Sequence, residues 1–413
     1  MGVFTTADIL LPKAVSMEKW AVIACDQFTS DAAYWQRVRE ATKNAPSTMH
    51  LILPEAELGT PMEAPHTRQI NCAMERYLAE EIFETCPDCF VYVERTLLSG
   101  AVRRGLVGKV DLEAYDYTPG SVSPIRATEK TVVERIPPRQ RVRQNAPLEF
   151  PHILMLCDDD KKELIEPIAA QKDTLQKLYE FDLMEQGGHI AGFLVSGEIA
   201  KAFAARLAAY TAKIGEKYIG LPGTPMVFAV GDGNHSLATA KSCYEALKAA
   251  HPGEDLSSHP ARYALVELEN IHDEALRFEP IHRILTKVEP KALLAALEKE
   301  CAAPEGFPVQ WFMGEESGTL YLNKEKGQLA VGVLQSFLDD YLQKNPGEID
   351  YIHGEEAVKT LARQENAIGF LLPVMGKSEL FCGVIADGIL PRKTFSMGHA
   401  VEKRYYLEGR KIK

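Results

Sequence analysis

The clearest pattern of apolar and polar positions lies at residues 226–250. Residues 226–230 are a short apolar run, which predicts a buried strand. Residues 237–250 are rich in alanine, and Leu237, Tyr244 and Leu247 share one side of the helix that this spacing predicts. The six residues between them, 231–236, are glycine or polar. A strand that turns directly into a helix points backbone N–H groups at the turn, and the helix dipole adds positive charge there.

The turn at 231–236 admits two interpretations. Gly231 and Gly233 let a ligand approach closely, and Asp232 and His235 supply a carboxylate and an imidazole, a combination that suits a phosphorylated ligand. Alternatively, the Asp, Asn and Ser side chains are ordinary helix caps in an ordinary glycine turn. The segment matches neither the Walker loop nor the dinucleotide glycine pattern. His235 is not a usual cap residue, which keeps the ligand interpretation open.

Apolar periodicity elsewhere predicts further strands and helices. We expect strand 90–96 to pair antiparallel with 103–111, and strand 262–270 to lie beside 226–230. Ser30 or Asp31 is expected to cap a helix that ends at Thr42. The other expected strands cover 50–54, 153–157 and 190–196, and the other expected helices cover 63–85, 161–178, 197–216 and 290–301.

Composition limits the class of protein. A chain of 413 residues is long enough for two or three domains, and 46% apolar with 25% charged residues is typical of globular proteins. The net charge of -12 argues against a surface that wraps nucleic acid, so nucleic acid is not an expected partner. No run of eighteen apolar residues predicts a membrane span, and the first residues lack the pattern of a signal peptide. Eight scattered cysteines then indicate reduced thiols in the cytoplasm.

Cys86 and Cys89 are the only closely spaced cysteine pair. A redox pair and half of a zinc site are two functional interpretations. No second pair with this spacing follows, and no histidine lies at finger spacing. We therefore expect free thiols without bound metal.

Residues 115–151 combine many prolines with a concentration of basic side chains. A solvated loop with balancing charge is one interpretation. A phosphate-facing segment is the other, because arginine forms forked, charge-assisted bonds to phosphate. Both remain open at this stage. The basic residues are Arg126, Lys130, Arg135, Arg139, Arg141 and Arg143.

Several segments occur in the order of motifs known from one family. Cys25-Asp26 lies where that family has a Pro-Tyr-Asp turn. Residues 128–131, Thr-Glu-Lys-Thr, lie where it has His-Glu-Arg-Thr, and Arg141 matches a following arginine. Residues 232–236 match Asp-Gly-His-His-Arg, residues 280–283 match Pro-Thr-His-Arg, and residues 391–396 match a closing Pro-Pro-Lys-Ser-Thr. Over nearly its whole length the chain resembles the domain-of-unknown-function family 1015, which is related to the ParB, sulfiredoxin and free serine kinase superfamily.

Three positions depart from these motifs. Asn234 replaces the first histidine of the central motif, Ser236 replaces its arginine, and Thr128 replaces the histidine before Glu129. A site that lacks one arginine and two histidines binds phosphate more weakly, takes a different nucleotide or has lost catalysis. The departures leave these alternatives open.

The resemblance implies an α+β, mixed-sheet multidomain protein with a ParB/sulfiredoxin-like core. An N-terminal α/β domain is expected at 1–114. The core is expected at 115–289, with a helical insertion near 160–220. A C-terminal α/β region at 290–413 is expected to return to the site.

The resemblance also implies a function, namely a nucleotide-dependent phosphotransferase (a kinase) acting on the hydroxyl of a small metabolite in the cytoplasm. The expected partners are a nucleoside di- or triphosphate with Mg²⁺ and the hydroxylated metabolite. Glu129 would be the general base, and Asp232 and His235 would act on the phosphate side. The implied phosphate-binding residues are Gly231, Gly233, Asn234, Ser236, Arg141, His282, Arg283, Lys393 and Thr394. The alternatives are a nucleotide-binding or nucleotide-hydrolysing switch and a catalytically silent, metabolite-binding regulatory protein.

Overall fold

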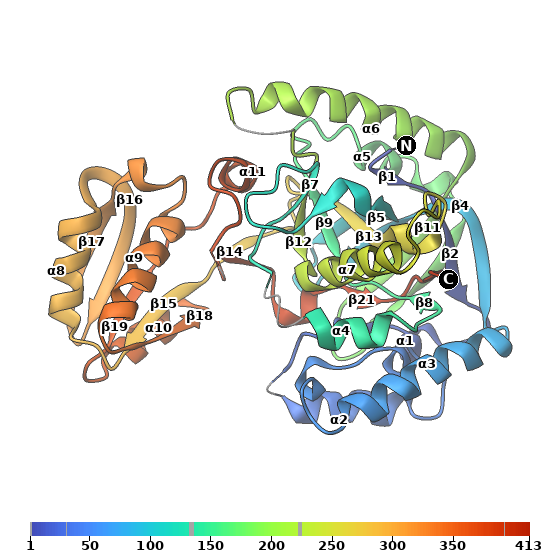
Figure 1. Ribbon diagram of the computed structural model, residues 1–413, viewed down its shortest axis with the longest axis horizontal. Helices are drawn as coiled ribbons and strands as arrows, with labels where there is room; N and C mark the ends of the chain where they lie inside the picture. The colour runs from blue at the N-terminus through green and yellow to red at the C-terminus, as the bar shows by residue number, and fades with distance from the viewer. Residues whose placement is uncertain (1, 30, 132–135, 222–224, 392) are drawn as a thin grey trace.

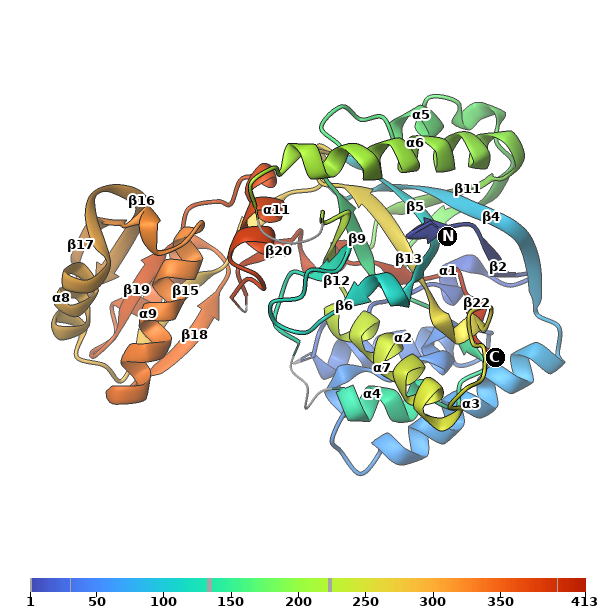
Figure 2. The same ribbon diagram turned by 45° about the horizontal axis from the view of Figure 1, so that its top comes forward.

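The computed structural model describes residues 2–29, 31–131, 136–221, 225–391 and 393–413. Ser30 and Arg135, expected as a helix cap and a phosphate-facing cation, lie outside these residues, as does Arg392 of the closing motif. The chain forms a large body and a smaller unit at its side (Figure 1, Figure 2). Sheets and helices build both, and the sheet of the large body is mixed, so the expected α+β class is confirmed. Within the described residues, no helix combines the length and apolar character needed to cross a membrane.

One mixed sheet organises the large body. Its strands come from both sides of residue 114, so the sheet crosses the domain boundary expected there. Strands β1 (Phe4–Thr5) and β2 (Ala7–Pro12) pair with β5 and β4 at its side. The main path runs β10 (Lys177–Asp182), β11 (His189–Val195), β4 (Phe83–Thr96), β5 (Val102–Asp111), β13 (Tyr263–Asn270), β9 (Leu154–Cys157), β12 (Phe228–Asp232), β7 (Ile125–Ala127) and β6 (Tyr115–Asp116).

The two faces of this sheet bury different cores, because successive side chains of a strand point to opposite faces. On β4, Val91 and Val93 enter one core while Phe90 and Tyr92 enter the other. Helix α6 (Gly197–Lys217) covers the face of Phe90. Helices α2 (Ala32–Thr42) and α3 (Glu63–Ala79) cover the opposite face (Figure 1).

The smaller unit is an antiparallel five-stranded sheet, and its apolar core continues into the large body at residues such as Leu156 and Ala229. Its strands run in the order β17 (Glu316–Leu322), β16 (Ala302–Met313), β19 (Ile368–Leu371), β15 (His282–Thr286) and β18 (Glu348–Ile352). The helices in the same part of the chain are α8 (Pro290–Cys301), α9 (Ala330–Lys344) and α10 (Glu355–Ala362).

The end of the chain returns to the large body. After α11 (Lys377–Ala386), β20 (Phe395–Met397) pairs with β14 (Phe278–Pro280). Strand β21 (Tyr405–Tyr406) then pairs with β3 (Val22–Ile23), and β22 (Arg410–Lys411) pairs with β8 (Leu148–Glu149). Both termini therefore lie on the large body (Figure 1).

The predicted pairing of strands 90–96 and 103–111 is confirmed, with Val91 opposite Val107 in an antiparallel register. The predicted contact between strands 226–230 and 262–270 is wrong. Strand β9 lies between them, antiparallel to β12 and parallel to β13. An apolar run identifies a buried strand but carries no information about which strand lies beside it.

Two predicted elements have a different conformation. Residues 50–54 are not a strand, because Ser47 accepts a hydrogen bond from the Met49 N–H (3.1 Å) and starts a 3-10 helix at Thr48–Leu51. The helix predicted at 161–178 is reduced to α5 (Glu166–Ala169), and β10 begins at Lys177. The insertion expected near 160–220 is therefore helical only in part, since it also contains the β10–β11 hairpin.

Candidate functional site

Sheet topology brings two carboxylates together. Strands β7 and β12 are neighbours and parallel, with Ala127 opposite Val230. Their carboxyl ends therefore meet at one edge of the sheet, where Glu129 follows β7 and Asp232 ends β12. The Thr128 hydroxyl donates to the Val230 carbonyl (2.6 Å) and fixes the two ends to each other.

A cavity of about 720 Å³ opens at this edge. Both carboxylates line it, together with His235 from the start of α7 (Asn234–Ala250). The smaller unit adds His353 from the loop between β18 and α10, and the returning chain adds Lys403. Of the residues expected from the sequence, the cavity wall contains Glu129, Asp232, His235, Gly231, Gly233, Asn234, Ser236 and Lys393.

Helix α7 begins at this cavity without a side-chain cap. Gly233 occupies the N-cap position with a φ of 76°, and a Cβ there would lie 3.0 Å from the Ile153 Cα. The Leu237 N–H bonds to the Gly233 carbonyl (3.0 Å), so the helical ladder starts one turn into the helix. The capping interpretation of the turn is thus wrong: its polar side chains have other partners.

The partners of Asn234 and Ser236 are Thr128, which follows β7, and His152, which precedes β9. The Asn234 amide oxygen accepts from the Thr128 N–H (3.3 Å), and the Ser236 hydroxyl contacts His152 Nε2 (3.2 Å). Asp232 Oδ1 accepts from the Gly233 N–H (3.0 Å). The backbone at the start of α7 therefore keeps the electrostatic character of an uncapped helix N-terminus, which favours an anion.

The electrostatics differ between the two carboxylates. Burial raises the pKa of Glu129 above the ordinary 4.5. The positive charge and N–H of Lys393 oppose this shift, while the charge of Asp232 adds to it. Asp232 Oδ2 lies 3.4 Å from the Lys403 ammonium and is buried without a hydrogen bond. A carboxylate with a raised pKa is a better proton acceptor, so Glu129 suits general base chemistry.

His152 connects two hydroxyl groups at the cavity wall. The Tyr406 hydroxyl accepts the Cys25 N–H (3.0 Å) and lies 2.8 Å from His152 Nδ1. Nε2 faces the Ser236 hydroxyl and lies 3.9 Å from Asp26. Ser236 is therefore joined through His152 to Tyr406 behind the cavity wall.

Asp26 keeps its charge beside this imidazole. Burial alone would raise the pKa of Asp26, but the charge of His152, the hydrogen bond from Gln27 and the charge of Lys403 together lower it. The cavity thus holds an ionised carboxylate on one wall and a carboxyl with a raised pKa, Glu129, on another.

Four residues expected to bind phosphate lie elsewhere. Arg141 pairs with Glu63 (3.0 Å), and its side chain is half-exposed. His282 is buried and accepts the Leu372 N–H through Nδ1 (3.2 Å). The remaining two are Arg283 and Thr394, both buried. These residues match family motifs in the sequence, but the sequence does not indicate the direction in which each side chain points.

Arg283 supports the backbone of the cavity wall, and its charge also interacts with Glu129. Its guanidinium donates to Gln335 (2.8 Å) and to the carbonyls of Ile281 (2.6 Å) and Lys393 (2.9 Å). Burial lowers its pKa to about 10. Thr394 donates to the Pro391 carbonyl (2.7 Å). Both residues therefore hold the segment that carries Lys393, whose φ is 58°.

Other cavity residues were not singled out from the sequence. Lys403, His152 and His353 stand in no motif, and only the fold brings them to the turn. Arg139 belongs to the basic segment noted above; it lines the cavity and pairs with Glu55 (3.2 Å). The family motif matches Arg141, two residues further along, and not Arg139.

Metal-binding clusters of three or more His, Cys, Asp or Glu side chains are absent from the described part of the chain. Cys86 and Cys89 both lie on β4, and the Cys89 thiol contacts the Cys86 carbonyl (3.3 Å). Burial raises the pKa of both thiols, to about 12 for Cys89. That these cysteines are free of metal stays a prediction.

Comparison with solved structures finds distant similarity. A free serine kinase variant in complex with AMP matches with 12% identity and a TM-score of 0.39, covering 74% of this chain and 91% of that one. SbnI with a C-terminal truncation, from Staphylococcus aureus, matches with 11% identity and a TM-score of 0.34, covering 70% and 84%. A free serine kinase variant in complex with ADP matches with 14% identity and a TM-score of 0.31, covering 51% and 85%.

No match was found among curated proteins. A family model does match, over residues 9–374, which is most of the chain. The expected family is therefore confirmed: the chain belongs to the family described as protein of unknown function DUF1015.

Proposed function

We propose that this protein transfers a phosphoryl group from a nucleotide to the hydroxyl of a small molecule. One observation carries the proposal. Glu129 and Asp232 stand at the ends of adjacent parallel strands, in one cavity with the uncapped start of α7 and the cations Lys393 and Lys403. Phosphoryl transfer depends mainly on positioning and electrostatic stabilisation, and this cavity offers both.

The nucleotide phosphates would lie against the turn before α7. The N–H groups of the first helical turn and the helix dipole favour negative charge there. Gly233 allows this turn, since any side chain at its φ of 76° would be strained and would press against Ile153. Lys393 and Lys403 would stabilise the charge on the equatorial oxygens of the transferred group.

Glu129 would act as the general base. Its carboxylate takes the proton of the acceptor hydroxyl while the hydroxyl oxygen forms a bond to the terminal phosphorus. The bond from that phosphorus to the bridging oxygen breaks, and the electron pair leaves with the shortened nucleotide. A positioned base of this kind contributes roughly 10²–10⁴-fold in rate. The raised pKa of Glu129 supports the role.

Asp232 is the residue whose chemistry fits a Mg²⁺ ion. Its Oδ2 is buried without a hydrogen bond, and Mg²⁺ is commonly held by one or two carboxylates plus phosphate oxygens. The ion would neutralise charge on the phosphates during transfer. Lys403, 3.4 Å from Oδ2, currently compensates the carboxylate and would yield part of that role to the metal.

A nucleotide-binding protein without transfer activity is the second candidate. The buried Thr128–Asn234 contact favours it, because two hydrogen-bonding side chains of the turn region are used inside the protein rather than on a ligand. Binding without turnover across a panel of hydroxylated metabolites would support this candidate.

Calorimetry with Mg-ATP and Mg-ADP tests the nucleotide site. Lys393→Met should weaken binding about tenfold, since a lost charge-assisted contact costs about 1.5 kcal/mol or more. Lys248→Met removes a lysine from the far end of α7, where it pairs with Glu113 (2.9 Å), and should bind like the wild type. Absence of nucleotide binding, or equal affinity in the wild type and Lys393→Met, would contradict the proposal.

A further inference from the structure

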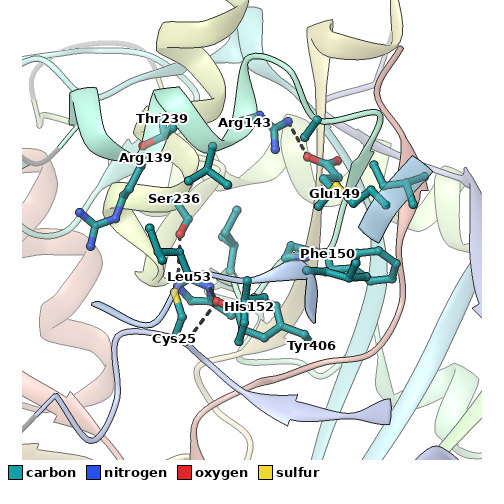
Figure 3. Close-up of a pocket in the computed structure, with 18 of the residues that line it drawn as sticks. Cys25, Leu53, Arg139, Arg143, Glu149, Phe150, His152, Ser236, Thr239 and Tyr406 are labelled. Atoms are coloured by element: carbon teal, nitrogen blue, oxygen red, sulfur yellow. Dashed lines mark hydrogen bonds and ion pairs between the residues drawn. The ribbon is translucent and has the colours of Figure 1, made fainter. Parts of the chain in front are cut away.

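A second, smaller cavity lies directly behind the candidate active site. It has a volume of about 150 Å³ and shares Cys25, Arg139, His152 and Ser236 with the larger one. Figure 3 shows His152 and Ser236 joined across this common wall. We call the smaller cavity the apolar chamber. The shared residues make it an extension of the site rather than a separate one.

Apolar side chains from four segments form the chamber. They come from the 3-10 helix region near residue 51, from α3, from α4 (Ile136–Arg143) and from the segment around β8. The main apolar residues are Leu51, Ile52, Leu53, Met74, Val142 and Phe150. An engineered protein cavity of about this volume, lined in the same way, stays dry and binds benzene.

The charged groups around the chamber are already paired. Glu149 contacts both Arg143 and Arg410 at 2.5 Å (Figure 3 shows the first of these pairs). Burial and the neighbouring Asp26 raise the pKa of the Cys25 thiol to about 12, so the thiol is neutral. An ionised ligand group would be desolvated here without a free partner, which disfavours it.

One wall of the chamber is polar, which favours one orientation of a ligand. The Ser236 hydroxyl and the His152 Nε2 atom lie between the chamber and the turn before α7. A molecule with an apolar part in the chamber would present a neighbouring hydroxyl to these two groups. Each additional methylene buried there would improve binding by about fourfold.

We propose that the apolar chamber binds the compact apolar group, a ring or a branched chain, of a neutral hydroxylated acceptor. The inference rests on the proposed function, because it names the class of acceptor for the same site. The acceptor hydroxyl lies at the wall of Ser236 and His152, on the side of the chamber that faces the cavity of Glu129 and Asp232.

Methyl NMR on the full chain tests the inference without nucleotide. The Met74 methyl group lines the chamber and reports on its occupancy. The probes are 1-propanol, isobutanol, benzyl alcohol and, as a polar control, glycerol. We expect saturable shifts of Met74 with affinity rising along the first three and no shift with glycerol. Absence of saturable binding, or equal affinity for glycerol and benzyl alcohol, would overturn the inference.

Two cavity-filling variants make the test specific. Ala146→Leu fills the chamber and should weaken benzyl alcohol binding at least tenfold. Ala73→Leu fills a different cavity, beside α3, and should leave the affinity for benzyl alcohol unchanged. Equal weakening by both would overturn the assignment to the chamber. If Ala146→Leu does not fold, the affinities of the wild type for the four alcohols test the inference. Alcohol binding in a protein that binds no nucleotide would show that the chamber binds apolar alcohols, and it would overturn the proposed function together with the acceptor role.

Discussion

Thr128 and Asn234 contact each other across the carboxyl ends of β7 and β12. The Thr128 N–H donates to the Asn234 amide oxygen (3.3 Å), and the Asn234 amide nitrogen lies 3.4 Å from the Thr128 hydroxyl. Both side chains are buried. These are two of the three positions at which the chain departs from its family motifs, so the two departures contact each other inside the site.

The contact predicts non-additive stability effects. Asn234→Ala leaves the buried Thr128 N–H without its partner, which should cost about 1–3 kcal/mol of unfolding free energy. Combined with Thr128→Val, the loss should fall short of the sum by about 0.5 kcal/mol or more. Urea denaturation of both single variants and the double variant measures this, with exposed Thr118→Val as a control. Strictly additive losses would show that the two residues are independent.

Glu129 predicts a pH-dependent stability. Its pKa is raised above 4.5 in the folded protein, so the folded state binds more protons than the unfolded state between 4.5 and the raised value. Stability contributed by protonated Glu129 is present below pH 4.5 and is lost as the pH rises through the raised pKa. Glu129→Gln, which is always neutral, should therefore raise the Tm at pH 8. Thermal denaturation from pH 4 to 8 should show this gain shrinking towards pH 4. A constant difference would contradict the burial of the charge.

Replacement of Arg404, near the end of the chain, should strongly lower the free energy of unfolding. Its buried guanidinium bonds Glu267 (2.6 Å), Glu408 (2.7 Å) and the Pro151 carbonyl (2.5 Å). Arg404→Met would remove the ion-pair partner of two buried carboxylates, a loss of about 3–5 kcal/mol. Chemical denaturation measures it against Lys411→Met, an exposed change on β22. A loss equal to that control would show that the buried network contributes little.

Cys86 and Cys89 should be free of metal. The Cys89 thiol is buried against the Cys86 carbonyl, and its raised pKa opposes the thiolate form that zinc requires. Elemental analysis of the purified chain should therefore find much less than one zinc per protein. About one zinc per chain that disappears in Cys86→Ser would contradict this prediction.

Local patterns in the sequence predicted the turn at 231–236 but not the residues that face it across the cavity. The apolar run before Asp232 and the alanine-rich stretch after Ser236 predicted the strand and helix that position the turn. Glu129 was reached through the family motif, and the pairing of β7 with β12 explains its convergence with Asp232. Lys403 follows no such pattern, because only the return of the chain brings it to Asp232.

The direction of the side chains was the main feature of the site that the sequence did not predict. Arg139 and Arg141 are two residues apart in one basic segment, yet only Arg139 lines the cavity. Similarly, Lys393 lines it while Thr394 turns back to the Pro391 carbonyl. Charge and residue type are visible in a sequence, but the direction of a side chain depends on packing against distant segments.

The central claim is that Glu129 is the base of a phosphoryl transfer. Glu129→Gln keeps the shape of the carboxylate but cannot accept a proton, so the loss should appear in the chemical step rather than in binding. His235→Ala should instead weaken nucleotide binding as well, because the imidazole would face the phosphates.

The most direct measurement follows phosphorylated product by phosphorus NMR, with Mg-ATP and a panel of hydroxylated compounds, beside calorimetry of nucleotide binding. Glu279→Gln, on the same cavity wall and without a proposed role, is the matched control. The account predicts turnover by the wild type and Glu279→Gln, a loss of about 10²-fold or more in Glu129→Gln, and nucleotide affinity in Glu129→Gln close to that of the wild type. Turnover by Glu129→Gln at the wild-type rate would contradict it.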